Sequence, residues 1–157
     1  MPETATIVSQ DARAAGMASM LTEVPATTSH RSPPAVPTPG DAEAAIARLR
    51  EMSADVRGCA VLGSDGELLA ASGDPQRWQE AAAVLLGAAD LAGDAPAELV
   101  HVATEDGEVF AVRHAGLAMV VASERFALAS LMAFDMRTVL RDLANDHRQV
   151  RSRTWRP

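Results

Sequence analysis

Gly58 to Gly73 reads Gly-Cys-Ala-Val-Leu-Gly-Ser-Asp-Gly-Glu-Leu-Leu-Ala-Ala-Ser-Gly, two apolar runs of strand length on either side of Asp65-Gly66. An Asp-Gly pair supplies the positive φ angles that a two-residue type I′ turn requires. We therefore predict a β-hairpin with Asp65-Gly66 as its loop. In this register Leu62 faces Leu69.

Both faces of this predicted hairpin are apolar. One face carries Ala60, Leu62, Leu69 and Ala71, and the other carries Cys59, Val61, Leu68 and Ala70. A sheet that meets water on one side alternates apolar and polar residues, so the sheet that contains this hairpin must be covered on both faces. The flanking segments have to supply these covers.

The composition fits one cytoplasmic domain with tails. The chain has 157 residues and one cysteine, Cys59, which inside an apolar strand is expected to be a buried thiol that acts as a small hydrophobe. No basic leader followed by a long apolar stretch opens the sequence, and no run approaches the roughly 18 apolar residues of a membrane span. We therefore expect a cytoplasmic protein without a membrane span.

Charge is divided unevenly along the chain. Residues 41–147 hold 18 acidic residues and 8 arginines, a net charge of −10, whereas residues 148–157 hold four arginines and no acid. The acidic part argues against specific nucleic-acid binding. The basic C-terminal tail suits an acidic partner, an anionic membrane, a nucleic acid or the acidic domain of the chain itself.

The N-terminal residues 1–40 have the composition of a linker. They are rich in Ala, Thr, Ser and Pro, and we predict a disordered tail. Residues 10–23 form a marginal helical pattern behind Ser9, which leaves a docking peptide as the alternative. We place the boundaries of the folded domain at residues 41 and 147.

Two of the predicted helices flank the strands. The first begins at Asp41 as N-cap and ends at Gly58. Its apolar stripe consists of Ala42, Ile46, Leu49, Met52, Ser53 and Val56. The last helix spans about Ala127 to His147. Its apolar face consists of Leu128, Leu131, Met132, Met136, Val139, Leu140 and Leu143.

The middle helix, about Pro75 to Ala92 behind the N-cap Asp74, has two apolar stripes. One stripe consists of Trp78, Ala82, Leu85 and Ala89, and the other consists of Ala81, Val84, Ala88 and Leu91. A helix that packs on one sheet needs only one stripe, so the other is expected to be a contact surface, with self-association as the first candidate. The alternative is a helix held between sheet and tail. The pattern does not decide which stripe faces the sheet.

Three strands follow this helix. Leu99 to Thr104 and Val109 to His114 flank Asp106-Gly107, which repeats the turn chemistry of Asp65-Gly66. The apolar run 117–122 reads as a central strand. The complete order is helix, two strands, helix, three strands, helix.

Over residues 41–146 this order resembles the roadblock family, named for a dynein light chain, and its bacterial regulators of Ras-like GTPases. The resemblance is carried by Gly58–Gly73, the alanine-rich middle helix, and the Asp106-Gly107 hairpin before the long last helix. It implies an α+β sandwich, a five-stranded antiparallel sheet with one helix on one face and two on the other.

The resemblance also implies a homodimer that binds a small Ras-like GTPase. In the family the middle helices pair, the third strands join edge to edge, and the paired helices meet the GTPase. The residues of this chain that correspond to the dimer or partner interface are Arg77, Trp78, Ala81, Ala82, Val84, Leu85, Ala88, Ala89, Leu99, His101 and Ala103.

The sequence carries no convincing catalytic or metal-binding pattern. Its four histidines are dispersed, and Gly63-Ser-Asp-Gly66 lacks the lysine and the following helix of a phosphate-binding loop. We therefore expect no enzyme, no cofactor and no bound metal. Arg77 is a conceivable arginine finger, although a solvated surface arginine is the default interpretation. The alternative function is a ligand-binding sensor, or a protein-interaction module without a GTPase partner.

Overall fold

In the computed structural model of the chain, residues 36–153 are described, and they form three helices and five strands. The elements are α1 Pro39–Met52, β1 Val56–Leu62, β2 Leu68–Ala71, α2 Pro75–Leu91, β3 Leu99–Ala103, β4 Glu108–His114, β5 Leu117–Ser123 and α3 Ala129–Arg153. The predicted order of elements is confirmed. The predictions for residues 1–35 and 154–157 lie outside the described residues.

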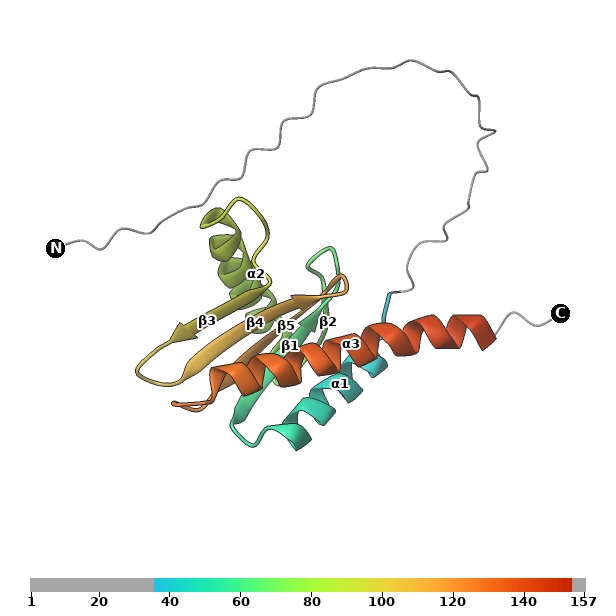
Figure 1. The fold of residues 1–157 in the computed structure, drawn as a ribbon, viewed down its shortest axis with the longest axis horizontal. Helices are drawn as coiled ribbons and strands as arrows, with labels where there is room; N and C mark the ends of the chain where they lie inside the picture. The colour runs from blue at the N-terminus through green and yellow to red at the C-terminus, as the bar shows by residue number, and fades with distance from the viewer. Residues whose placement is uncertain (1–35, 154–157) are drawn as a thin grey trace, which may run out of the picture. The chain divides into compact units, whose positions relative to one another are not determined.

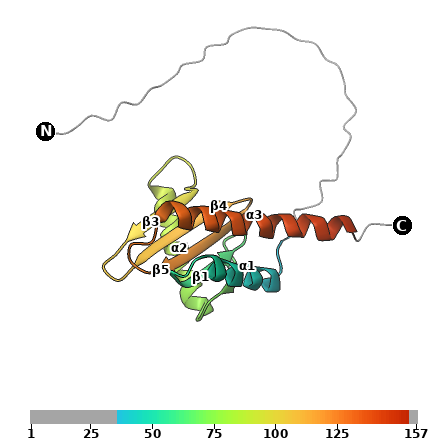
Figure 2. The same cartoon turned by 60° about the horizontal axis from the view of Figure 1, so that its bottom comes forward.

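The strands form one antiparallel sheet in the order β2-β1-β5-β4-β3, with β2 and β3 at its edges. Helices α1 and α3 lie side by side on one face, and α2 lies on the other (Figure 1). Figure 2 shows the pair α1 and α3 in front of the sheet. The predicted α+β sandwich, with two helices on one face and one on the other, is confirmed.

The face beneath α1 and α3 holds the larger core. Nineteen buried apolar residues form it, among them Leu49 of α1, Phe110 of β4 and Leu140 of α3, each 0% exposed. Cys59 is also 0% exposed, and its burial raises the pKa of the thiol to about 11. At neutral pH Cys59 is therefore a protonated, shielded thiol that packs as a hydrophobe.

The predicted two-residue loop of the first hairpin is wrong. The backbone N–H of Gly63 donates to the carbonyl of Glu67, so Ser64, Asp65 and Gly66 form a three-residue loop, in which only Gly66 has a positive φ (77°). Leu62 therefore pairs with Leu68 rather than Leu69, and a bulge restores the predicted pairing beyond it. Leu68 therefore shares the α2 face with Leu62, and Leu69 packs on the face of α1 and α3, so the prediction that Leu69 shares a face with Leu62 is wrong.

The positive φ angles predicted for the β3–β4 turn occur instead in the turn between β4 and β5. Thr104 donates to the carbonyl of Gly107, so the loop between β3 and β4 is Glu105-Asp106, and Gly107 has no positive φ. A Cβ on Gly107 would lie 2.5 Å from the carbonyl oxygen of Ser123, so this glycine is needed for close approach to β5. The positive φ pair predicted for Asp-Gly occurs at Ala115-Gly116, at 53° and 77°.

Helix α1 begins and ends earlier than predicted. Thr38, not Asp41, is its N-cap, and Asp41 is the third helical residue of a capping box with Thr38. The helix ends at Met52 because Ser53 is already extended, and Val56 begins β1. Gly58 therefore lies in a strand, where a Cβ would come within 2.9 Å of the Trp78 ring.

Helix α3 begins at Ala129 and continues to Arg153, six residues beyond the predicted end. The predicted apolar face is confirmed from Met132 to Leu143 but is wrong at its start, because Leu128 and Leu131 are exposed. The end of the helix reaches past α1 and the sheet in both views (Figures 1 and 2).

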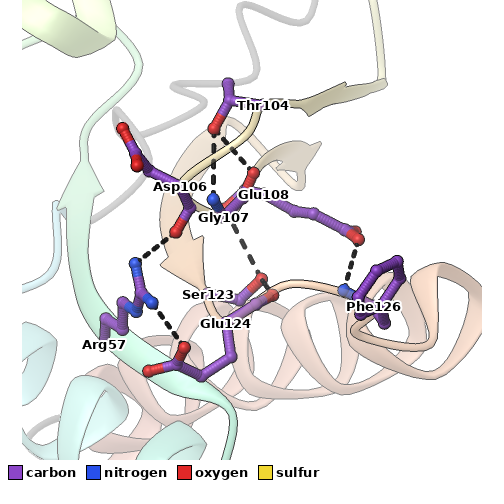
Figure 3. Close-up of polar contacts among 8 residues, drawn as sticks. All are labelled: Arg57, Thr104, Asp106, Gly107, Glu108, Ser123, Glu124 and Phe126. Carbon is purple, nitrogen blue, oxygen red and sulfur yellow. Dashed lines mark hydrogen bonds and ion pairs between the residues drawn. The ribbon is translucent and has the colours of Figure 1, made fainter.

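A polar cluster joins the β3–β4 hairpin to the strands beside it (Figure 3). Arg57 of β1 donates to the carbonyl of Asp106 at 2.6 Å and pairs with Glu124 after β5. Glu108 accepts a hydrogen bond from the backbone N–H of Phe126 at 2.8 Å, which holds Phe126 at its positive φ of 64°. The cluster therefore fixes both the hairpin and the turn into α3.

Candidate protein-interaction surface

An apolar groove opens between α2 and the strands β3, β4 and β5. It has a volume of about 880 Å³. Its apolar wall consists of Trp78, Ala81, Val84 and Leu85 of α2 and Val102, Val109, Val120 and Ala122 of the strands. The groove exists because one helix cannot cover five strands, and α2 is held toward the β1–β2 side of the sheet.

A capped helix start and two side chains, Trp78 and Gln79, hold α2 there. Asp74 caps the helix by accepting from the backbone N–H groups of Gln76 and Arg77, and Pro75 occupies the first turn, as predicted. The indole N–H of Trp78 donates to the carbonyl of Ser72 at 2.7 Å. Gln79 accepts from the N–H of Leu68 and donates to the carbonyl of Gly66, both at 2.8 Å.

The far end of α2 is fixed by a two-pronged ion pair. Both terminal guanidinium nitrogens of Arg113 donate to the carboxylate of Asp90, at 2.6 and 2.9 Å. Hydrogen bonding to Arg113 holds the pKa of Asp90 below its ordinary value. Asp90 also accepts from the backbone N–H of Ala97, so the pair fixes the connection between α2 and β3.

The structure decides which stripe of α2 faces the sheet. Ala82 and Leu86 are buried against the sheet, and Trp78, Leu85 and Ala89 are half-buried beside them. The other stripe points to solvent: Val84 is 73% exposed and Leu91 90% exposed, and Ala81 and Ala88 of the same stripe are also exposed. The outward stripe of α2, defined as Ala81, Val84, Ala88 and Leu91, is thus a free apolar surface on one side of the groove.

Within residues 36–153, no strand pairs with the outer edge of β3. Thr104 pairs with Gly107 and Glu98 with Arg113 by hydrogen bonds, so the alternation of an antiparallel ladder turns the N–H and C=O groups of Leu99, His101 and Ala103 outward. The strand carries no lysine, proline or bulge that would block pairing with another strand. The free edge of β3 is therefore open to a sixth strand.

His101 is fixed at the centre of this edge. Its ring stacks on Phe110 with centroids 4.4 Å apart and planes 5° from parallel, and its Nε2 lies 2.8 Å from Glu108 Oε2. These contacts place the His101 side chain on the face of α1 and α3. In contrast, Val100 packs against the core beneath α2, and Val102 lines the groove on the same face.

The predicted interface residues divide into three groups. Arg77, Trp78, Ala81, Val84 and Leu85 all line the groove, and Ala88 lies on the outward stripe. Leu99, His101 and Ala103 adjoin the groove only through their backbone edge, because their side chains point to the other face. Ala82 is 0% exposed and Ala89 half-buried, so neither forms the accessible surface.

The sequence analysis missed the sheet side of the groove. Val102, Val109, Val120 and Ala122 form it. A signal was present: one face of the edge strand carries Val100 and Val102, and the strand after it begins with Val109, so apolar residues continue to the edge of the sheet. A strand of this kind requires cover that the described chain does not provide.

Residues 36–153 contain no group of three or more His, Cys, Asp or Glu side chains arranged to hold a metal ion. None of the helices in this range is both long and apolar enough to span a bilayer. The features left to explain are the groove, the outward stripe of α2 and the free edge of β3.

Solved structures share this fold. A Roadblock/LC7 domain from Streptomyces avermitilis is 19% identical, with 64% of this chain and 92% of that chain covered and a TM-score of 0.53. MglB from Myxococcus xanthus is 15% identical, with 68% and 94% covered and a TM-score of 0.53. LokiProfilin1, solved in complex with rabbit actin, is 15% identical, with 69% and 98% covered and a TM-score of 0.51.

Neither the protein-family models nor the curated proteins gave a match to this sequence. The structural likenesses, which cover 64–68% of this chain, confirm the roadblock fold predicted from the sequence. The likeness to LokiProfilin1 shows that this architecture is not confined to roadblock proteins. The choice of function therefore depends on the surface of this chain.

Proposed function

We propose that the chain is a non-catalytic, homodimeric roadblock module that binds a small Ras-like GTPase and regulates or scaffolds it in the cytoplasm. The observation that carries this proposal is the apolar groove, which lies between the outward stripe of α2 and the free edge of β3. The roadblock fold and the family resemblance of the sequence support it.

A second copy of the chain complements this surface. Two identical strands that pair antiparallel are related by a two-fold axis, so two β3 edges can continue one sheet across both copies. The same axis sets the α2 helices of both copies on one face of the joined sheet, facing each other across the two grooves. Val84 and Leu91 would then be shielded from water together with the exposed wall of the groove, and small residues such as Ala88 let the helices approach closely.

A GTPase partner agrees with the absence of a nucleotide site from the sequence. The chain has no phosphate-binding loop, so any GTP chemistry must belong to the partner. Arg77 at the rim of the groove is exposed and forms no ion pair among the described residues, which leaves it available to an acidic or phosphate-bearing surface.

The dimer is tested by light scattering on the full chain. At tens of micromolar we expect twice the mass of one chain, and we expect Val84→Glu to give a monomer because it places a charge in the contact. Val36→Glu is the matched control, since Val36 is 57% exposed and lies away from the groove at the start of α1. A monomeric wild-type chain would refute the dimer.

The GTPase is tested by retention on the immobilised full chain. The probes are small Ras-like GTPases of the same organism, each loaded with GDP or a non-hydrolysable GTP analogue. We expect one of them to be retained in a nucleotide-dependent way and to be lost with Val84→Glu. If no GTPase is retained in either nucleotide state, the partner of this chain is another kind of protein.

The ligand-sensor alternative is distinguished by native mass spectrometry of the purified chain. A bound metabolite whose occupancy falls with Ala81→Trp, which fills the groove, would support it. A chain that carries no added mass while it retains a GTPase supports the proposed module.

A further inference from the structure

A second apolar surface lies at the start of α3, on the layer opposite to α2. Phe126 is 85% exposed, Leu128 65%, Leu131 53% and Phe134 62%. We call these four residues the α3 patch. Leu128, Leu131 and Phe134 follow one another at a spacing of three residues, so neighbouring side chains are adjacent on the helix surface. Large apolar groups that gather in this way mark contact sites.

The α3 patch is exposed because α1 is too short to cover it. The two helices run antiparallel, with Arg48 of α1 paired to Asp142 of α3 at 2.8 Å and Asp41 near His147 at 3.0 Å. Helix α1 has 14 residues and α3 has 25, which corresponds to about 21 Å against about 37 Å. The first turns of α3 therefore extend beyond the end of α1.

A carboxylate without a partner adjoins the α3 patch. Asp135 lies one turn after Leu131 on the same side of α3 and is 6% exposed. It forms no hydrogen bond or ion pair among the described residues, and burial raises its pKa. Its oxygens are not sealed, because no carboxylate oxygen within residues 36–149 is both fully enclosed and without a hydrogen bond. A cation that reached Asp135 would relieve an unfavourable burial.

The chain itself carries a matching cationic segment at the other end of α3. Residues 148–157 contain four arginines, Val150 and Trp155, and no acid. Arg148 is exposed and forms no ion pair with any described residue. The segment therefore offers apolar side chains to the α3 patch, where Arg125 already lies over the Phe126 ring at 4.9 Å, and positive charge to Asp135.

The segment cannot reach the α3 patch of its own chain. Leu131 and Arg148 are 17 positions apart on one continuous helix, about 26 Å, and the helix carries the chain further away as far as Arg153. From there the patch is about 33 Å distant, whereas residues 154–157 span about 13 Å when fully extended. An occupant with this sequence must come from a second copy.

We propose that the α3 patch, Phe126, Leu128, Leu131 and Phe134, binds the basic C-terminal segment, residues 148–157, of a second copy of this chain, with an arginine of that segment paired to Asp135. In a two-fold arrangement the exchange is reciprocal, so both patches are filled and the contact closes on itself. The surface is separate from the groove and from β3, so this contact does not depend on the proposed function.

Disulfide trapping between two single-site variants of the full chain tests the proposal. Ser130→Cys lies beside the α3 patch, and Ser152→Cys lies in the basic segment. Cys59 does not interfere, because it is buried and its thiol pKa is about 11. At tens of micromolar we expect the mixed disulfide to form at least tenfold faster than with Ser64→Cys, an exposed control in the β1–β2 loop.

Two further variants separate the apolar and the ionic parts of the contact. Leu131→Glu should reduce the trapping rate to that of the Ser64→Cys control, and Asp135→Asn should lower it several-fold. Raising the salt concentration to about 0.5 M should slow trapping, because it screens the arginines. Trapping should persist in a Val84→Glu background, which disrupts only the contact made by α2.

Three results would overturn the proposal. The first is a mixed disulfide that forms no faster than with the control. The second is trapping that Leu131→Glu leaves unchanged. The third is rapid self-linking of Ser130→Cys without Ser152→Cys, which would show that two α3 patches meet each other.

Discussion

The face of the sheet under α1 and α3 buries 19 apolar residues, whereas the face under α2 buries six and leaves a groove of about 880 Å³. The strands are apolar toward both faces, so the difference comes from the covers. Two helices, one of them 25 residues long, close the first face, and a single helix of 17 residues leaves the second face open. The closed face therefore holds most of the buried core, and the open face carries the groove on which the proposed dimer depends.

The largest effect should come from a cavity in the closed face. Leu140 is 0% exposed in the larger core, so Leu140→Ala is expected to lower the free energy of unfolding by about 2–5 kcal/mol. Val84→Ala on the open face should change the free energy of unfolding of the monomer by less than about 0.5 kcal/mol. Urea denaturation of the monomeric chain measures both. Equal losses would mean that the two faces do not differ in this way.

Two glycines give a finer comparison. A Cβ at position 107 would lie 2.5 Å from the carbonyl oxygen of Ser123, so Gly107→Ala should destabilise the domain by about 1–3 kcal/mol. No atom lies within 4 Å of a Cβ at position 87 on the exposed side of α2, so Gly87→Ala should stabilise the helix by about 1 kcal/mol. Thermal unfolding of the two variants should shift in opposite directions, and a shift in the same direction would contradict this account.

The two glycines also show how far the sequence predicts the fold. Apolar patterning and the Asp74-Pro75 start signal predict the order of elements and the start of α2 correctly, because each is a local property of the chain. The same local chemistry fails at Asp106-Gly107, where the glycine is required by contact with β5 rather than by its φ. Close approach between distant strands leaves no mark in the neighbouring residues.

The candidate site divides in the same way. Two apolar stripes on α2 predict that one stripe is not needed to cover the sheet. Only the packed structure shows that the exposed stripe is the one that contains Val84 and Leu91. Leu128 and Leu131 of the α3 patch are predicted core residues because they continue the apolar face of α3 in sequence, but both are exposed. Their exposure follows from the length of α1, which ends at Met52 and not at the predicted Gly58. A boundary error in one helix thus concealed a surface on another.

A smaller increase in the free energy of unfolding is expected from the turn between β4 and β5, two strands that contribute residues to the cores on both faces. Ala115 has a φ of 53°, a conformation that costs a side-chain-bearing residue roughly 1–2 kcal/mol. Ala115→Gly should therefore stabilise the domain by about 0.5–1 kcal/mol, after the greater entropy of glycine in the unfolded chain is allowed for. Hydrogen exchange should slow in α2 and in α3 alike. Slowing on one face alone would show that the faces unfold separately.

The last comparison sets two aspartates against each other as a function of pH. Arg113 lowers the pKa of Asp90 on the open face, so Asp90 stabilises the folded chain above the unfolded pKa of about 3.9, and this contribution is lost as pH falls through the lowered pKa. Burial raises the pKa of Asp135 on the closed face, so its ionisation destabilises the folded chain at neutral pH, and protonation removes this penalty.

Asp90→Asn should therefore lower the free energy of unfolding at pH 7, and Asp135→Asn should raise it. The Asp135→Asn difference should shrink as pH falls from the raised pKa of Asp135 toward the unfolded value of about 3.9, whereas the Asp90→Asn difference should shrink only below about 3.9, as pH falls toward the lowered pKa of Asp90. Urea denaturation of the monomeric chain from pH 7 down to the lowest pH at which it remains folded measures the two trends. A stabilising Asp90→Asn at pH 7 would mean that the ion pair with Arg113 does not hold α2 on the open face.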